Sequence, residues 1–174
     1  MRILVAYASV EGQTLRIARF VASRIAELGH TAELFDADVK GAVASFDEFD
    51  RIVLAASVHR RRHPVEFEKF LARNRDTLAG FPTLQISVSL CAAFPQGMEE
   101  AQSYLDEMQE RTGFAATQGA LVAGALQFEK YKDYESQVVR FIALDLKRFD
   151  VVDEDHEFTD WSDVAARVDA FLSA

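Results

Sequence analysis

Short apolar runs alternate along the chain with segments whose apolar positions recur at helical spacing. Residues 52–56 are apolar throughout, which is typical of a strand covered on both faces. Residues 13–28 place apolar side chains three or four positions apart and end before Gly29, so they predict a helix. The pattern predicts strands at 2–7, 31–35, 51–56, 83–90 and 117–123. It predicts helices at 13–28, 97–111, 134–149 and 159–172, and a further helix opened by Pro64.

The alternation of strands and helices indicates the class of fold. Right-handed crossovers between parallel strands follow from this order, and five strands in this rhythm suit a doubly wound α/β sheet. The last helix is expected to have Thr159 as its N-cap, with Ser162 and Asp163 in its first turn, after an acidic loop at 153–157. The 174 residues contain no repeat and no long linker, so we expect one domain over 1–174.

The composition of the chain argues against some classes of function but does not identify one. Hydrophobic residues make up 49% of the chain, which is enough for a full core. The formal charge of −9 disfavours general binding to nucleic acid or to anionic lipid. The lone cysteine, Cys91, excludes an internal disulfide and fits a reducing cytoplasm. No apolar segment reaches the ~18–20 residues that span a bilayer, so we expect a cytoplasmic protein.

The loop between the first strand and the first helix has the features of a phosphate site. It consists of Ser9, Val10, Glu11, Gly12, Gln13 and Thr14. A phosphate there would meet unpaired backbone N–H groups and the positive end of the helix dipole. Ser9 and Thr14 add hydroxyl donors, and Gly12 permits close approach or a positive φ. We predict that this loop binds a monophosphate; an ordinary turn with a helix cap is the alternative.

Two familiar phosphate loops do not match this segment. No lysine follows Gly12, so the loop is not the Gly-x-x-x-x-Gly-Lys loop of nucleoside triphosphatases, and the Gly-x-Gly-x-x-Gly pattern of dinucleotide-binding proteins is absent. In an open α/β sheet, ligands bind beyond the carboxyl ends of the strands, where the strand order reverses. The third and fourth strands are therefore expected to end beside this loop.

The end of the third strand places small residues before a cluster of cations. The residues are Ala56, Ser57, Val58 and His59, followed by Arg60, Arg61 and Arg62. Small residues at a strand end suit the close approach of a flat ring. Arginine forks bind carboxylates in a bidentate manner, so the cluster is predicted to recognise the anionic groups of a substrate. A solvated loop with helix-flanking charges is the alternative.

The fourth strand ends at Ser89, Leu90 and Cys91, which can offer backbone groups to the edge of such a ring. Cys91 is interpreted as a small buried residue rather than a redox group. His59 and His63 have no third ligand in view, so we predict no metal site.

Aromatic residues gather after the fifth strand, at 124–134. Tyr131 lies between Lys130 and Lys132, a pattern that suits a planar anionic partner, although a loop that folds its aromatics onto the core would look the same. The predicted helix 134–149 is apolar over more than one stripe. Burial explains much of this, and a homodimer interface or a peripheral membrane contact would explain the excess.

Several of these segments together resemble a known family. They are 11–14 with Ile17 and Ala18, 56–58, 123–126 with Tyr131 and Tyr134, and 159–161 with its Thr-Asp-Trp sequence. The chain resembles the flavodoxins and, more closely, the bacterial flavodoxin-like protoporphyrinogen oxidases, the menaquinone-dependent enzymes of haem synthesis. The late segments are the more specific, because short-chain flavodoxins do not typically share them.

The resemblance implies a flavodoxin-like five-stranded parallel sheet of order 2-1-3-4-5 with helices on both faces, and flavin mononucleotide (FMN) held by the three strand-end loops. It also implies an FMN-dependent oxidoreductase that removes hydrogens from a porphyrinogen substrate and passes electrons to a quinone, with a peripheral position at the inner membrane. Since the flavin carries the chemistry, no catalytic base is assigned. An FMN electron carrier that docks to a protein redox partner is the alternative, favoured by the acidic surface.

Overall fold

The computed structural model describes residues 1–41, 44–126 and 155–174. The predicted helix 134–149 and the aromatic residues from 127 onward, Tyr131 included, lie outside the described residues.

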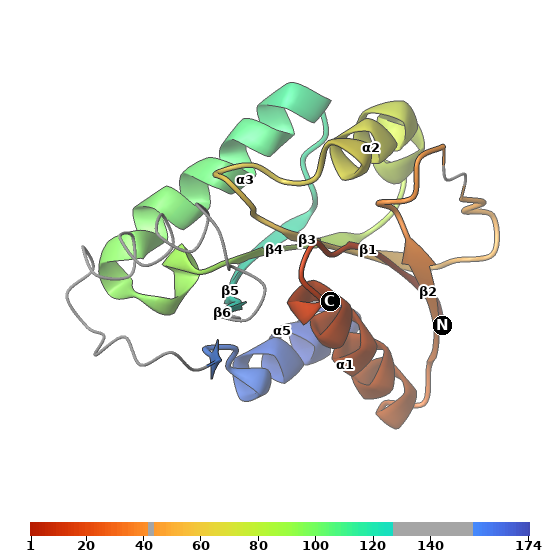
Figure 1. Ribbon diagram of the computed structural model, residues 1–174. Coiled ribbons are helices and arrows are strands. Elements are labelled where there is room, and N and C mark those ends of the chain that lie inside the picture. Colours follow the sequence, from red (N-terminus) through yellow and green to blue (C-terminus); the bar gives the residue numbers. More distant parts are fainter. Residues whose placement is uncertain (42–43, 127–154) are drawn as a thin grey trace.

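Five parallel strands form the main sheet in the order β2-β1-β3-β4-β5 (Figure 1). They are β1 (Arg2–Ala8), β2 (Thr31–Asp36), β3 (Arg51–Ser57), β4 (Thr83–Ser89) and β5 (Gln118–Ala123). Each observed end lies within one residue of its predicted position. The predicted doubly wound sheet and its strand order are confirmed.

Helices cover both faces of this sheet (Figure 1). On one face lie α1 (Gln13–Glu27) and α5 (Trp161–Ser173), and on the other lie α2 (Val65–Leu78) and α3 (Met98–Thr112). Two short 3-10 helices, η1 (Cys91–Ala93) and η2 (Pro95–Gly97), connect β4 to α3. Gly97 is required here, because a Cβ at this position would overlap the carbonyl oxygen of Cys91.

The apolar strands supply two separate cores because their side chains alternate between the faces. In β1, Ile3 and Val5 pack under α1 and α5, whereas Leu4 and Ala6 pack under α2 and α3. The other strands are less uniform. In β4 the face toward α1 and α5 is apolar. The face toward α2 and α3 is polar, and it buries Gln85, Ser87 and Ser89. β2 lies at one edge of the sheet, and several of its side chains are exposed.

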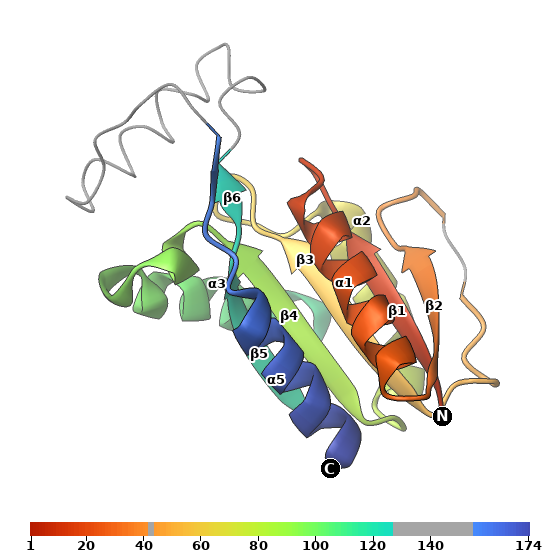
Figure 2. The same ribbon diagram turned by 90° about the horizontal axis from the view of Figure 1, so that it is seen from below.

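A short antiparallel ribbon extends the carboxyl end of β5 (Figure 2). It pairs β6 (Ala125–Leu126) with β7 (His156–Glu157). The prediction of an acidic loop over 153–157 is therefore wrong for its last two residues. Strands of two residues are too short to show an alternating pattern.

The N-cap of the last helix also differs from the prediction. Asp160, not Thr159, is the cap, because its carboxylate accepts from the N–H groups of Ser162 (2.9 Å) and Asp163 (3.0 Å). The hydroxyl of Thr159 instead donates to the carbonyl of Ala123 at 2.7 Å, which ties the start of α5 to the end of β5.

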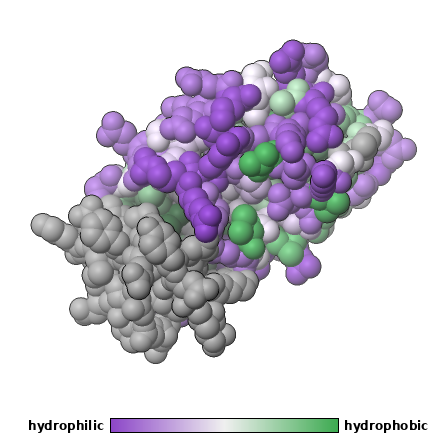
Figure 3. Space-filling view, turned by 45° about the horizontal axis from the view of Figure 1, so that its top comes forward, coloured by the Kyte–Doolittle hydropathy of each residue, from purple (hydrophilic) through white to green (hydrophobic). Residues whose placement is uncertain are grey.

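The molecular face in Figure 3 is mostly hydrophilic, and its hydrophobic side chains lie in small separate groups. The formal charge of the chain is −9. Among the helices of the described residues, none combines the length and apolar character needed to cross a membrane.

Candidate functional site

The strand register brings three loops to one edge of the sheet. Ala8 of β1 lies opposite Ala56 of β3, and Ser57 lies opposite Val88 of β4. The loops that follow β1, β3 and β4 therefore begin at nearly the same level. This is the arrangement expected for a ligand beyond the carboxyl ends of the strands, at the point where the order reverses.

The loop after β1 is held in shape by the hydroxyl of Ser9. Its Oγ accepts from the N–H groups of Gly12 (3.1 Å) and Leu15 (3.2 Å), while Gly12 adopts a left-handed φ of 100°. The backbone N–H groups of Gln13 and Thr14 have no acceptor among the described residues. Such N–H groups at the start of a helix favour an anion.

Thr14 supplies a direct test of whether the loop fits a phosphate. The residue is 1% exposed, and its Oγ1 finds no hydrogen-bond partner in the described chain. Buried hydroxyls almost always have a partner, so an orphan of this kind at a helix start indicates a missing acceptor. A phosphate oxygen would satisfy it, and the residues present therefore fit a phosphate-bearing cofactor.

Two contacts join the loops after β1 and β3. The N–H of Val10 donates to Ser57 Oγ at 3.4 Å, and Nδ1 of His59 lies 3.3 Å from the carboxylate of Glu11. Val58 continues the line of β3, since its N–H donates to the carbonyl of Val88 at 2.7 Å. The structure thus brings together the residues that the sequence predicted at 9–14 and 56–59.

The third loop is more buried than the other two. Ser89 Oγ accepts from the N–H of Ala92 at 3.3 Å and closes the turn that carries Leu90 and Cys91. The Cys91 thiol faces the carboxylate of Glu100 at 3.7 Å, and burial, followed by this negative charge, raises the pKa of the thiol. A protonated, buried thiol is a poor nucleophile.

The arginine cluster forms a tight hairpin. His59 and Arg62 exchange two backbone hydrogen bonds, of 2.9 and 3.1 Å, across the turn. The two central residues, Arg60 and Arg61, both have left-handed backbones with φ of 50° and 64°. Glycine or asparagine normally occupies such positions, and each L-residue there costs roughly 1–2 kcal/mol. Contacts from neighbouring helices must hold the hairpin in place.

One of these contacts is made by Glu100 of α3. Arg61 Nη1 lies 2.8 Å from its Oε1, and the hydroxyl of Tyr104 donates to the same oxygen at 2.6 Å. The Arg61 guanidinium also lies over the Tyr104 ring, 5.7 Å from its centroid. The side chain of Arg61 is therefore directed toward α3.

A second contact is made by Glu68 of α2, which is buried. Its carboxylate accepts from Arg62 Nε at 3.1 Å and from Arg111 Nε at 3.0 Å. Burial alone would raise the pKa of Glu68, but the hydrogen bonds from both arginines hold that pKa below its usual value. Two of the three arginines that the sequence assigned to a substrate thus pair with carboxylates of the chain itself.

His63 follows the hairpin and lies apart from His59. It is 1% exposed, its Nε2 contacts Ser87 Oγ at 3.0 Å, and its Nδ1 has no partner in the described chain. Burial lowers its pKa to about 4. The two histidines therefore have different environments and share no ligand position.

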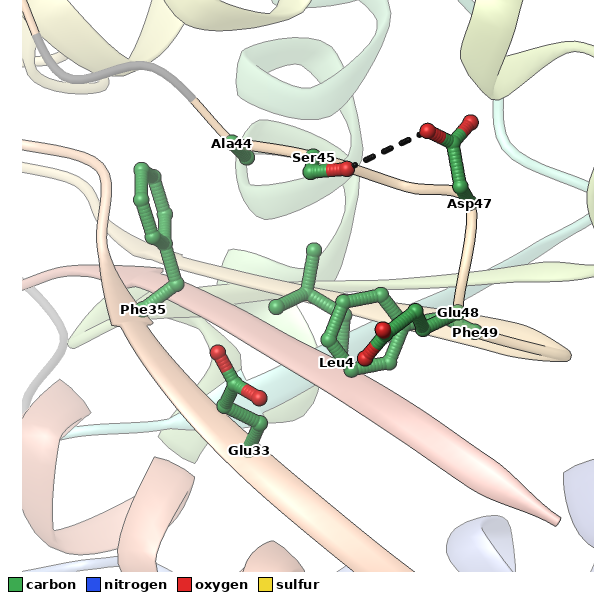
Figure 4. A pocket seen from close by; sticks show the side chains of 8 residues that line it. All are labelled: Leu4, Glu33, Phe35, Ala44, Ser45, Asp47, Glu48 and Phe49. Carbon is green, nitrogen blue, oxygen red and sulfur yellow. Dashed lines mark hydrogen bonds between the residues drawn. The ribbon is translucent and has the colours of Figure 1, made fainter.

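A hollow of about 450 Å³ lies elsewhere, near the amino ends of β1 and β3. Figure 4 shows Leu4, Phe35 and Phe49 beside the carboxylates of Glu33 and Glu48. Carboxylates of this kind would repel a phosphate, so the hollow does not compete with the strand-end loops as a cofactor site.

Comparison with known proteins agrees with this geometry. The flavodoxin domain family matches residues 4–151, and the chain belongs to that family. Membership of this family makes it an FMN-binding protein, as the sequence predicted.

A particular relative covers almost the whole chain. The chain is 25% identical over 166 residues to protoporphyrinogen IX dehydrogenase (quinone) of Escherichia coli strain K12, spanning 95% of this chain and 91% of the relative.

Solved flavodoxins share the fold. Oxidised flavodoxin 2 from Bacillus cereus superposes with a TM-score of 0.53 and 21% identity, covering 84% of this chain and 97% of the flavodoxin. A short-chain flavodoxin associated with a non-canonical PDU bacterial microcompartment gives a TM-score of 0.54 and 17% identity, covering 71% and 82%.

Sequence reasoning missed the acidic partners of this site. The sequence places Glu11 in the cofactor loop but does not predict its approach to His59. It gives no indication of a role for Glu68 or Glu100. Their only sequence signal is a helical position that faces the arginines, and this cannot be recognised before the hairpin is placed.

Proposed function

We propose that this chain is an FMN-dependent oxidoreductase that oxidises protoporphyrinogen IX to protoporphyrin IX and passes the electrons to a quinone. The observation that carries the proposal is the similarity to the Escherichia coli dehydrogenase across 95% of this chain. It is supported by a strand-end site that fits a phosphate-bearing cofactor and by an arginine hairpin beside that site.

The roles of the chain's own residues follow from their contacts. Ser9 shapes the phosphate loop, and the N–H groups of Gln13 and Thr14 with the Thr14 hydroxyl would hold the phosphate. The flavin ring would be flanked by the ends of β3 and β4, that is, by Ala56, Ser57, Val58 and His59 and by Ser89, Leu90 and Cys91. When bound, FMN supplies the electron-accepting chemistry that removes hydrogens from the substrate.

Within the hairpin, Arg60 is our candidate for contact with a substrate carboxylate. It is one of the two central residues of the turn between His59 and Arg62, at the edge of the candidate site. Arg61 and Arg62 contact Glu100 and Glu68. We propose that Arg61 and Arg62 position the hairpin, and that Arg60 and Tyr131 contact the substrate. Changing Arg60→Gln should then raise KM several-fold and leave kcat nearly unchanged, because binding rather than chemistry is weakened. Arg73→Gln, an exposed change on α2, is the matched control.

The direct test is anaerobic mixing of the FMN-loaded protein with protoporphyrinogen IX and a menaquinone analogue. Porphyrin fluorescence should rise faster than in a mixture without protein. Equal rates would contradict the proposed reaction and leave the FMN assignment intact.

An electron-carrier role is the second candidate. The formal charge of −9 and the hydrophilic face in Figure 3 favour it, since electron carriers commonly dock to partners through complementary charge. The same mixing experiment separates the two: an electron carrier takes up FMN but does not accelerate porphyrin formation.

We further propose that residues 1–174 form one domain. Supporting this, α5 packs against α1, with Val164, Val168 and Phe171 in the same core as Ile17 and Val21. A cytoplasmic location, a homodimer and a peripheral contact with the inner membrane remain proposals that rest on the sequence.

A further inference from the structure

Gln13 is the first residue of α1 and belongs to the phosphate loop, yet its side chain is bonded to residues near the other end of the chain. The residue is 6% exposed. Its Nε2 donates to Glu157 Oε1 at 2.6 Å and to Thr159 Oγ1 at 2.9 Å. The side-chain amide is therefore fully engaged within the protein, whereas the backbone N–H of the same residue has no acceptor among the described residues.

One of the two acceptors of this amide belongs to β7, and the other lies in the connection between β7 and α5. Glu157 belongs to β7, whose partner β6 continues the chain just beyond β5. Thr159 in turn contacts the main sheet, since its hydroxyl donates to the carbonyl of Ala123 at the end of β5. The contacts of Gln13 therefore reach β7 directly and, through Thr159, the end of β5 that leads into β6.

Further bonds hold the base of the ribbon in one arrangement. The N–H of Phe158 donates to the carbonyl of Gly124 at 3.0 Å, across the ribbon. Arg16, one helical turn after Gly12, lies 3.0 Å from Glu157 Oε1 and donates to Gln13 Oε1 at 3.3 Å. Both polar atoms of the Gln13 amide thus have partners, and the ribbon is attached to the first turn of α1.

We propose that Gln13 is a positioning residue that couples FMN binding to the β6–β7 ribbon, so that each stabilises the other. A phosphate on the loop would restrain the backbone of Gln13 through its N–H group. With its backbone restrained, the Gln13 side chain would lose less conformational entropy when it bonds to Glu157 and Thr159. Such coupling is reciprocal: whatever factor FMN adds to the stability of the ribbon, the intact ribbon adds to the affinity for FMN.

Hydrogen exchange of the full chain with and without FMN tests the coupling. The readouts are the amide of Phe158 and those of the ribbon residues 125–126 and 156–157. In the unchanged protein, saturating FMN should slow their exchange by about tenfold or more. In Gln13→Met, which keeps the side-chain volume but has neither a strong donor nor a strong acceptor, the slowing should fall to about threefold or less. Gln102→Ala, on the exposed face of α3, should keep the full effect.

Affinity for FMN gives an independent check on the same coupling. The Kd of Gln13→Met, measured by quenching of flavin fluorescence, should rise by the same factor by which the protection of the ribbon falls. Thr159→Val leaves the loop sequence intact and should show the same paired losses, which keeps the test decisive if Gln13→Met does not fold.

The proposal would be overturned if FMN slowed hydrogen exchange of the ribbon in both variants as much as in the original protein. It would also be overturned if FMN did not change the exchange rates of the ribbon in the original protein. Neither measurement uses a porphyrinogen or a quinone. The coupling therefore stands or falls separately from the proposed reaction.

Discussion

His63 is a buried titratable side chain that follows the arginine hairpin directly. Its ring contacts Ser87 and lies near the charges of Glu68 and Arg111, with burial as the main influence on its pKa, which falls from 6.5 to about 4. The imidazole is therefore neutral in the folded protein at neutral pH, although it titrates normally in the unfolded chain.

This difference predicts an acid-sensitive stability. Between pH 6.5 and about 4 the unfolded chain binds a proton at His63 and the folded chain does not, so the free energy of unfolding falls as the pH falls through this window. The full loss is about 3 kcal/mol, from the difference between the pKa of 6.5 in the unfolded chain and about 4 in the folded chain. Urea unfolding at pH 7.5, 5.5 and 4 should show a smaller loss in His63→Gln. Equal losses in the two proteins would contradict the assignment.

The hairpin at 59–62 is an element whose shape depends on its neighbours. Its two left-handed arginines are unfavourable on their own, and ion pairs to α2 and α3 balance that cost. Glu68 contributes most to this anchoring, because its buried carboxylate accepts both from Arg62 of the hairpin and from Arg111 of α3.

Replacing Glu68 by Gln should lower the free energy of unfolding by about 3 kcal/mol, since two guanidinium groups lose a buried carboxylate partner. Urea unfolding at pH 7.5 measures this change. Glu66→Gln is the matched control on the same helix, where the carboxylate accepts from Lys69 at 2.7 Å and is less buried than that of Glu68, so its transition should move much less. A Glu68 variant as stable as the Glu66 variant would contradict the anchoring role.

The long elements were predictable because each carries its own pattern. The strand 51–57 is apolar at every buried position, and α1 repeats its apolar residues at helical spacing up to Ile25. Thr159 shows where such reasoning stops. Its hydroxyl could cap a helix as well as Asp160 does, and the choice depends on Ala123, a carbonyl that only the folded chain brings within reach.

The candidate site was predictable to a similar extent. The phosphate loop and the three strand ends follow from the order of the elements, and the register brings them together. The pairing of Arg61 with Glu100, 39 positions away, follows instead from the packing of α3 against the hairpin. No local pattern encodes a contact of that kind.

At the scale of the whole molecule, cofactor binding should stabilise the fold, because FMN would bind loops that only the folded sheet brings together. FMN at about 100 times its Kd should raise the free energy of unfolding by about 2.7 kcal/mol. In Thr14→Val, a tenfold loss of affinity would reduce this gain by about 1.4 kcal/mol at the same FMN concentration. Urea unfolding with and without FMN measures both values.

Thr77→Val, on the exposed surface of α2, serves as the control and should respond to FMN as the original protein does. If the response of Thr14→Val is equally large, the buried hydroxyl of Thr14 does not bind the phosphate.

The edge strand β2 bears on how copies of the chain can associate. An unpaired edge strand is a template on which a second sheet can continue, and natural proteins guard against such aggregation with charge. This edge carries Glu33 and Asp36, both exposed. Two such edges brought together would concentrate carboxylates of like sign, which opposes pairing. We therefore expect β2 to resist fibre-like growth, and a homodimer, where one forms, to use another surface.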